Sequence, residues 1–175
     1  MKWEEMAQLP RETILTLLND ALHNMLRIDA YWFIGMEKSL GIDNAIKVDE
    51  EVWRRFGKIE ATQVKNNFKL NGDGIGTLVK ALNLAPTWTL WADLCIEQIS
   101  DHEAVLQVLK CSSQVERLKA GAGVFNCKGV EHGYFESFAS VIDPRIKVHC
   151  NFCPPAKYFE NLWCEWHFSL ETARR

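Results

Sequence analysis

Apolar residues in the first half of the chain recur at steps of three and four residues, which is the period of an α-helix. One long helix is expected between Pro10 and Gly41, because proline suits a first helical turn and glycine commonly follows the last one. Similar spacing predicts further helices over residues 43–70 and 73–83. Residues 1–84 are therefore expected to form a helical region.

In the second half, apolar and polar residues alternate with the two-residue period of a β-strand. Alternation over residues 88–96 and 104–108 predicts one hairpin, and alternation over residues 145–150 and 162–170 predicts another. Two helices are expected between the hairpins, a short one over residues 113–121 and a longer one that begins at residue 126 or 127 and stops before Pro144.

Together these patterns predict an α+β fold. The helical part, residues 1–84, should pack on a small, mostly antiparallel four-strand sheet, which residues 85–175 form together with further helices. A length of 175 residues suits a single domain, and 47% hydrophobic with 25% charged residues is typical of globular proteins. We therefore expect one domain over residues 1–175.

Composition excludes several classes of protein. The net charge is −3 and no basic stripe is present, so nucleic acid is not an expected partner. The longest uncharged apolar run, Ala30–Met36, is too short to span a bilayer, and the first residues do not resemble a signal peptide. The phosphate-binding glycine motifs are absent, so no nucleotide cofactor is expected. We expect a cytoplasmic protein without a membrane partner.

A group of cysteines is the sharpest chemical feature of the sequence. Cys150 and Cys153 form a C-x-x-C pair, a spacing at which two thiolates can share one metal ion. Cys164 lies on the facing strand of the same expected hairpin, and its position there predicts the same core-facing side as Cys150. Cys127 begins a helix, where the helix dipole favours a thiolate. These four residues are candidate zinc ligands, with a reactive thiol or plain burial as alternatives; burial is the interpretation for Cys95 and Cys111.

Three carboxyl groups lie on apolar helix stripes, where charged residues are rarely found unpaired. They are Asp29 and Glu37 on the first long helix and Glu60 on the second. One interpretation is that a nearby arginine neutralises them, with Arg27, Arg54 and Arg55 as the candidates. The other is that they line a ligand pocket and act as metal ligands or as general acid and base.

Aromatic residues and one histidine extend the pocket hypothesis. Trp32 and Trp53 lie on helix faces that are expected to meet, and they could form either core or the apolar wall of a ligand pocket. His132 lies five residues after Cys127 in the same expected helix and could complete the site. Five residues place it about 140° around the helix from Cys127, which is poor geometry for a nucleophile and its base.

The carboxyl-terminal half resembles the 4-vinyl-reductase-type small-molecule-binding domain. The shared features are a helix opened by Cys127, a strand that ends in Cys150, and a last strand that contains Cys164 and Phe168. The segments Asp143–Val148 and Cys153–Pro155 are similar to uncharacterised prokaryotic cytosolic proteins related to the aminothiazoline-carboxylate hydrolase-like family. The resemblance implies an α/β ligand-binding fold and indicates Cys127, Cys150 and Cys164 as site residues.

Three functional classes remain open. The first is a small-molecule-binding or sensory domain, with zinc as its candidate cofactor. The second is a hydrolase of small cyclic or sulfur-containing compounds, with Cys127 as nucleophile or the carboxylates as acid and base. The third is a partner-binding structural subunit. A homodimer is compatible with each class, and the residues leave open whether the protein is an enzyme.

Overall fold

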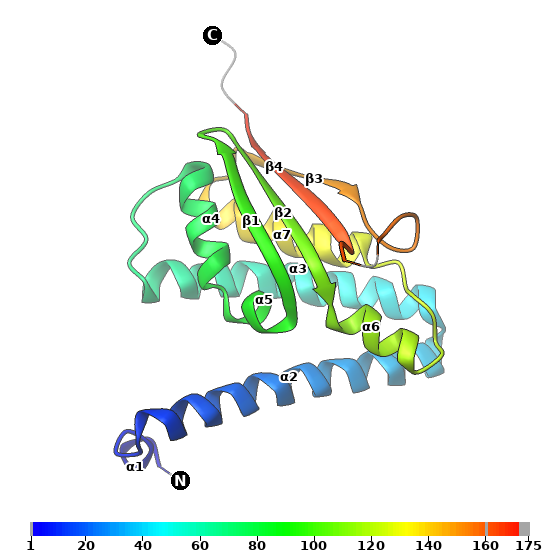
Figure 1. Ribbon diagram of the computed structural model, residues 1–175, viewed down its shortest axis with the longest axis horizontal. Coiled ribbons are helices and arrows are strands. Elements are labelled where there is room, and N and C mark those ends of the chain that lie inside the picture. The colour runs from blue at the N-terminus through cyan, green and yellow to red at the C-terminus, as the bar shows by residue number, and fades with distance from the viewer. Residues whose placement is uncertain (1, 160, 172–175) are drawn as a thin grey trace.

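A computed structural model describes residues 2–159 and 161–171, with the side chains of residues 89 and 90 left out. The fold is α+β, as the sequence predicts (Figure 1). The helices are α1 (Trp3–Met6), α2 (Arg11–Leu40), α3 (Ile42–Asn67), α4 (Gly74–Leu84), α5 (Pro86–Trp91), α6 (Ser112–Lys119) and α7 (Lys128–Ile142). The strands are β1 (Ala92–Ser100), β2 (Glu103–Cys111), β3 (Ile146–Phe152) and β4 (Cys164–Leu170).

The four strands form one sheet in the order β1-β2-β4-β3, and every neighbouring pair is antiparallel. Both expected hairpins are confirmed, and β2 joins them by pairing with β4. Burial alternates along β4, so that Cys164, Trp166 and Phe168 face the core. Helices α3, α4 and α7 lie on this face of the sheet (Figure 1).

One part of the strand prediction is wrong. Residues 86–91 form helix α5, and the first strand begins only at Ala92. Pro86 occupies the first helical turn, where its missing N–H costs nothing. Trp88 still reaches the core from this helix, because its ring stacks on Phe135 with 5.0 Å between ring centroids. Helix α6 begins one residue earlier than expected, at Ser112, and Cys111 occupies its N-cap.

The tightest contact between helices is the crossing of α3 and α7. Gly57 of α3 lies against the backbone of α7, where a Cβ atom would stand 2.6 Å from the carbonyl oxygen of Tyr134 and closer still to the hydroxyl of Ser137. Gly129 makes similar room near the start of α7, for the side chain of Glu50. Because Gly57 and Gly129 have no Cβ atom, the two helices can lie this close together.

Helix α2 differs from the others because none of its thirty residues is buried. Its carboxyl-terminal end contacts α3, whereas its amino-terminal part extends along the molecule at a distance from the sheet (Figure 1). The helix is amphipathic only in part, since many of its large apolar side chains are exposed. Across the described residues, no helix combines the length and apolar character that crossing a membrane requires.

We predict that Gly57→Ala destabilises the protein by about 1–3 kcal/mol, because the new methyl group has no space at the crossing of α3 and α7. Chemical unfolding of the purified variant measures this. Gly76→Ala on α4 is the matched control: its Cβ would make only ordinary contacts, 3.5 Å from the Gln98 side chain. The control should change the free energy of unfolding by less than about 1 kcal/mol. Equal effects of the two substitutions would contradict the proposed role of Gly57.

Candidate functional site

Four cysteines come together at one end of the sheet. Cys150 lies on β3, Cys153 follows that strand, Cys164 begins β4 and Cys127 is the N-cap of α7. Each is only 5–7% exposed. Cys150 and Cys164 lie on the same buried face of the sheet, as their positions in the hairpin predict. All six cysteines are free thiols.

The thiol of Cys153 is the most acidic of this group. Its sulfur accepts hydrogen bonds from Cys127 and from Cys150, and these bonds, with the nearby charge of Lys128, lower its pKa to about 7 against the opposing effect of burial. The same hydrogen bond to Cys153 is the main cause that holds the pKa of Cys127 well above its usual range. Burial, followed by the hydrogen bond to Cys153, raises the pKa of Cys150 to about 12.

The expected thiolate at Cys127 is therefore wrong. Although Cys127 does begin α7, it is buried and donates its proton toward Cys153. The charge of Glu131 in the first turn of α7 raises the pKa of Cys127 further, which opposes the helix dipole. Desolvation and the neighbouring acid outweigh the favourable position at the helix start.

Side-chain N–H groups of Gln114 and Trp166 form hydrogen bonds with the sulfurs of Cys127 and Cys164. The amide of Gln114 lies 3.5 Å from the Cys127 sulfur and also donates to the carbonyl oxygen of Phe125 at 3.0 Å. The indole N–H of Trp166 donates to the Cys164 sulfur at 3.3 Å. The thiols therefore occupy defined positions in a hydrogen-bonded interior.

Three carboxyl groups from three helices lie within electrostatic range of one another, and Glu131 among them also lies within range of the thiols. They are Asp29 of α2, Asp49 of α3 and Glu131 of α7, all half-buried. Burial is the main cause that raises the pKa of Asp29 to about 6, of Asp49 to about 7 and of Glu131 to about 8. The charge of Asp29 contributes to the shifts of the other two, and that of Asp49 to the shift of Glu131.

The carboxyl groups and the thiols form one electrostatic unit. The charge of Glu131 raises the pKa of Cys111, Cys127, Cys150 and Cys164, and the Cys153 sulfur in turn raises the pKa of Glu131. Within the part of the chain that the structure describes, the carboxyl groups of Asp29 and Glu131 have no ion pair and no hydrogen bond. The indole of Trp53 donates to Asp49. We name this group the acid–thiol cluster: Asp29, Asp49, Glu131, Cys111, Cys127, Cys150, Cys153 and Cys164.

Glu37 does not join this cluster. Its two carboxylate oxygens accept hydrogen bonds from Arg117 of α6 at 2.7 and 3.1 Å, which lowers the pKa of Glu37. The Arg117 guanidinium also lies over the rings of Phe33 and Phe125. This contact ties α2 to α6.

The three arginines expected to neutralise the buried acids have other partners. Arg27 donates to Asn24 at 2.8 Å, Arg54 pairs with Glu136 at 2.6 Å, and Arg55 pairs with Glu51. Each of these contacts is exposed. None of these three arginines therefore neutralises Asp29, Glu37 or Glu60, although a different arginine, Arg117, does pair with Glu37.

Glu60 is 2% exposed, which confirms that it faces the interior. The Tyr134 hydroxyl donates to one of its carboxylate oxygens at 2.5 Å, and the backbone N–H of Thr87 donates to the other at 3.1 Å. Glu60 therefore links α3 to α5 and α7 instead of lining a pocket.

The remaining predicted residues lie apart from one another. The ring nitrogen Nε2 of His132 lies 3.2 Å from the carbonyl oxygen of Val148, to which it donates, so His132 is fixed by β3. Trp53 packs against Trp91 and Tyr134 in the interior. Trp32 is 70% exposed, so the expected meeting of Trp32 and Trp53 was wrong. The sequence pattern of a long apolar helix stripe does not show which of its residues are buried by the rest of the protein.

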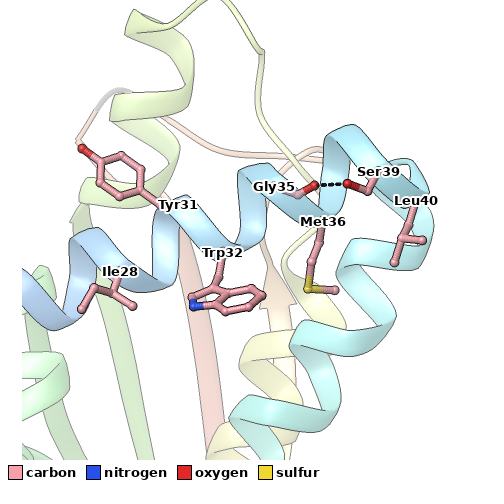
Figure 2. Close-up of a pocket in the computed structure, with 7 residues that line it drawn as sticks. All are labelled: Ile28, Tyr31, Trp32, Gly35, Met36, Ser39 and Leu40. Carbon is pink, nitrogen blue, oxygen red and sulfur yellow. Dashed lines mark hydrogen bonds between the residues drawn. The ribbon is translucent and has the colours of Figure 1, made fainter.

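Among the described residues, no group of three or more His, Cys, Asp or Glu side chains is placed to hold a metal ion. A hollow of about 630 Å³ lies along α2, and no residue of the acid–thiol cluster is among those that line it (Figure 2). It is lined by Ile28, Tyr31, Trp32, Gly35, Met36, Ser39 and Leu40.

Sequence reasoning missed Asp49, Glu131 and Cys111. A signal for the first two exists, because each interrupts an apolar helical line: Asp49 stands four residues before Trp53, and Glu131 stands four residues before Phe135. Cys111 ends β2 and offers no such signal. Its nearness to the cluster follows from the pairing of β2 with β4, which brings distant segments together.

The fold and the cluster define an α+β protein with an interior group of thiol and carboxyl side chains. The chain belongs to the family of unknown function DUF6125, which it matches over residues 7–170. Comparisons with curated proteins and with solved structures found no match.

The raised pKa of Glu131 predicts a pH-dependent stability. Protonated Glu131 stabilises the fold fully below its ordinary pKa of 4.5, and this contribution is lost as the pH rises through about 8. Glu131→Gln stays neutral, so its free energy of unfolding should exceed that of the wild type by about 1–2 kcal/mol at pH 9 but not at pH 5. Urea unfolding at both pH values measures this. Glu97→Gln, at an exposed position of β1, should show no such dependence; a pH-independent effect of Glu131→Gln would refute the raised pKa.

The thiol hydrogen bonds predict which cysteine ionises first. Alkylation by iodoacetamide, mapped by mass spectrometry across pH 5–10, should show a midpoint near pH 7 for Cys153 and a midpoint above pH 9 for Cys127. Burial slows both reactions, whereas the midpoint reports ionisation. In Cys127→Ala, which removes one hydrogen bond, the Cys153 midpoint should rise. A lower midpoint for Cys127 than for Cys153 would overturn this assignment.

Proposed function

We propose that this protein is a small-molecule-binding domain, and that the acid–thiol cluster holds a positively charged ligand. The observation that carries the proposal is that Asp29, Asp49 and Glu131 come from three helices to one half-buried place where they repel one another. Burying like charges together is unfavourable, and groups with pKa values shifted in this way cluster at functional sites. A cationic ligand would supply the missing opposite charge.

The pKa values favour a ligand that exchanges with protons. At neutral pH, acids with pKa values of about 6, 7 and 8 carry some protons, and a bound cation would displace them. Binding should therefore strengthen as the pH rises from 6 to 8. The ligand would also draw together α2, α3 and α7, because each helix supplies one carboxyl group. This coupling suits a sensory role, in which occupancy changes the position of α2.

Zinc remains a candidate for this ligand. Thiolates and carboxylates are ligands that zinc accepts, and the Cys153 sulfur contacts both Cys127 and Cys150. Because the described side chains are not placed as a metal site, zinc binding would need them to move. Magnesium prefers oxygen ligands, so it would bind to the carboxyl groups of the cluster and not to the thiols. Comparing magnesium with zinc therefore distinguishes the two parts of the cluster.

The proposal predicts that cations stabilise the protein against heat. Thermal unfolding at pH 7.5 should shift upward with zinc chloride or with a small organic diamine, because a ligand that binds the folded state stabilises it. Most of the shift should be lost in Glu131→Gln and retained in Glu97→Gln, an exposed position. Cys153→Ser should abolish the zinc response but not the diamine response. If neither cation raises the midpoint of the wild type, the proposal fails.

A second candidate function is hydrolysis of a small cyclic or sulfur-containing compound. The observation that favours it is the pairing of an acidic thiol, Cys153, with a carboxyl group of higher pKa, Glu131. Near neutral pH the first could act as a nucleophile while the second still donates a proton. Against it, Cys153 is 5% exposed, and a substrate would have to open the site. This candidate differs from the first in requiring turnover that depends on Cys153.

A further inference from the structure

The outer face of α2 is apolar, uncharged and uncovered. We define this face by Leu18, Ala21, Met25, Ile28, Trp32 and Gly35, all exposed; Leu18, Ile28 and Trp32 are 54%, 60% and 70% exposed. Figure 2 shows Ile28 and Trp32 projecting from the helix beside the hollow at Gly35. An uncovered apolar face of this length marks an interaction surface in a globular protein.

The spacing of this face is that of a helix that pairs with another helix. Its six residues follow one another at steps of three, four, three, four and three. This is the heptad pattern in which apolar side chains of two helices interlock along a seam. The opposite side of α2 has its own contacts, since Glu37 and Phe33 reach α6 and the following loop.

Gly35 gives independent support. It lies inside a long helix, where glycine is less favourable than alanine, and a Cβ atom there would meet nothing within 4 Å. Nothing in the described part of the protomer requires this glycine, in contrast to Gly57 at the crossing of α3 and α7. A glycine on an apolar seam permits the close approach of another helix.

The total surface area supports a partner of substantial size. The protomer exposes 10931 Å², whereas a folded monomer of 20.1 kDa is expected to expose roughly 8,700 Å². The excess of roughly 2,200 Å² exceeds the ~800 Å² that each partner buries in a standard interface. The excess is therefore large enough for a standard interface, and α2, which has no buried residue, contributes to it.

Charges beside the seam indicate what the partner is. Asp20 and Lys38 are exposed and lie eighteen residues apart, which is five complete helical turns, so they occupy the same flank of the seam. In an antiparallel pair of α2 helices centred near Ile28, each Lys38 lies level with Asp20 of the second copy. The same pairing sets Trp32 level with Met25, and Gly35 level with Ala21. A parallel pair would instead set Lys38 level with Lys38 and Asp20 level with Asp20.

We propose that two copies of this chain associate through the outer faces of α2, in an antiparallel arrangement with its two-fold axis near Ile28. The contact is isologous, because each copy presents the same surface and supplies both members of the charge pair. It does not depend on what the acid–thiol cluster binds.

Light scattering after size-exclusion chromatography tests the oligomeric state of the full chain. The wild type should have a mass of about 40 kDa at micromolar concentration, twice the 20.1 kDa of one chain. Ile28→Glu and Gly35→Met should raise the dissociation constant at least tenfold, because one places a charge and the other a bulky side chain in the seam. Both positions are exposed in the protomer, so circular dichroism should stay unchanged. Ile34→Glu, away from the seam on the same helix, is the matched control and should remain dimeric.

A charge exchange tests the antiparallel direction. Lys38→Asp should weaken the dimer severalfold, because it sets a second carboxylate against Asp20 of the second copy. The double variant, Asp20→Lys with Lys38→Asp, should restore the wild-type dissociation constant. A wild type that stays monomeric at 100 µM overturns the proposal, including when another protein or a lipid vesicle binds the same face. A dimer that Ile28→Glu leaves intact also overturns it.

Discussion

The close approach of α3 to α7 at Gly57 positions several of the interior polar groups. Because the two helices nearly touch, Glu60 of α3 reaches the hydroxyl of Tyr134 on α7. The same crossing brings Asp49 within the electrostatic range of Glu131, and it directs the amino-terminal end of α7, with Cys127, toward the end of the sheet. The electrostatics of the cluster are therefore a consequence of backbone packing.

The two kinds of interior acid show how partners decide the role of a carboxyl group. Glu60 accepts hydrogen bonds at both oxygens and links three helices, and Glu37 has a bidentate arginine. Glu131 has a comparable environment without such partners. Glu60 and Glu37 are satisfied by the chain itself, whereas the carboxyl groups of Asp29 and Glu131 have no such partner among the described residues. This difference separates Glu60 and Glu37, which link helices, from the acids that we propose to bind a ligand.

Much of the fold could be predicted from local pattern, because helical and strand periods are properties of short segments. The helix over residues 11–40, the two hairpins and the shared face of Cys150 and Cys164 all follow from spacing. The failures concern contacts between distant segments. Glu37 pairs with Arg117 across eighty residues, and the acidity of Cys153 depends on thiols from two other positions. The prediction that Trp32 meets Trp53 was wrong for a related reason, since periodicity shows that a helix has an apolar face but not which segment covers that face.

The tie between Glu37 and Arg117 has a mechanical consequence for α2. It fixes the helix near its carboxyl-terminal end, whereas Arg11 lies twenty-six residues away, about 39 Å along the axis. A rotation of about 5° around this anchor would displace the amino-terminal end by roughly 3 Å. The helix is therefore a lever arm, on which a small change of angle at the fixed end becomes a large displacement at the free end.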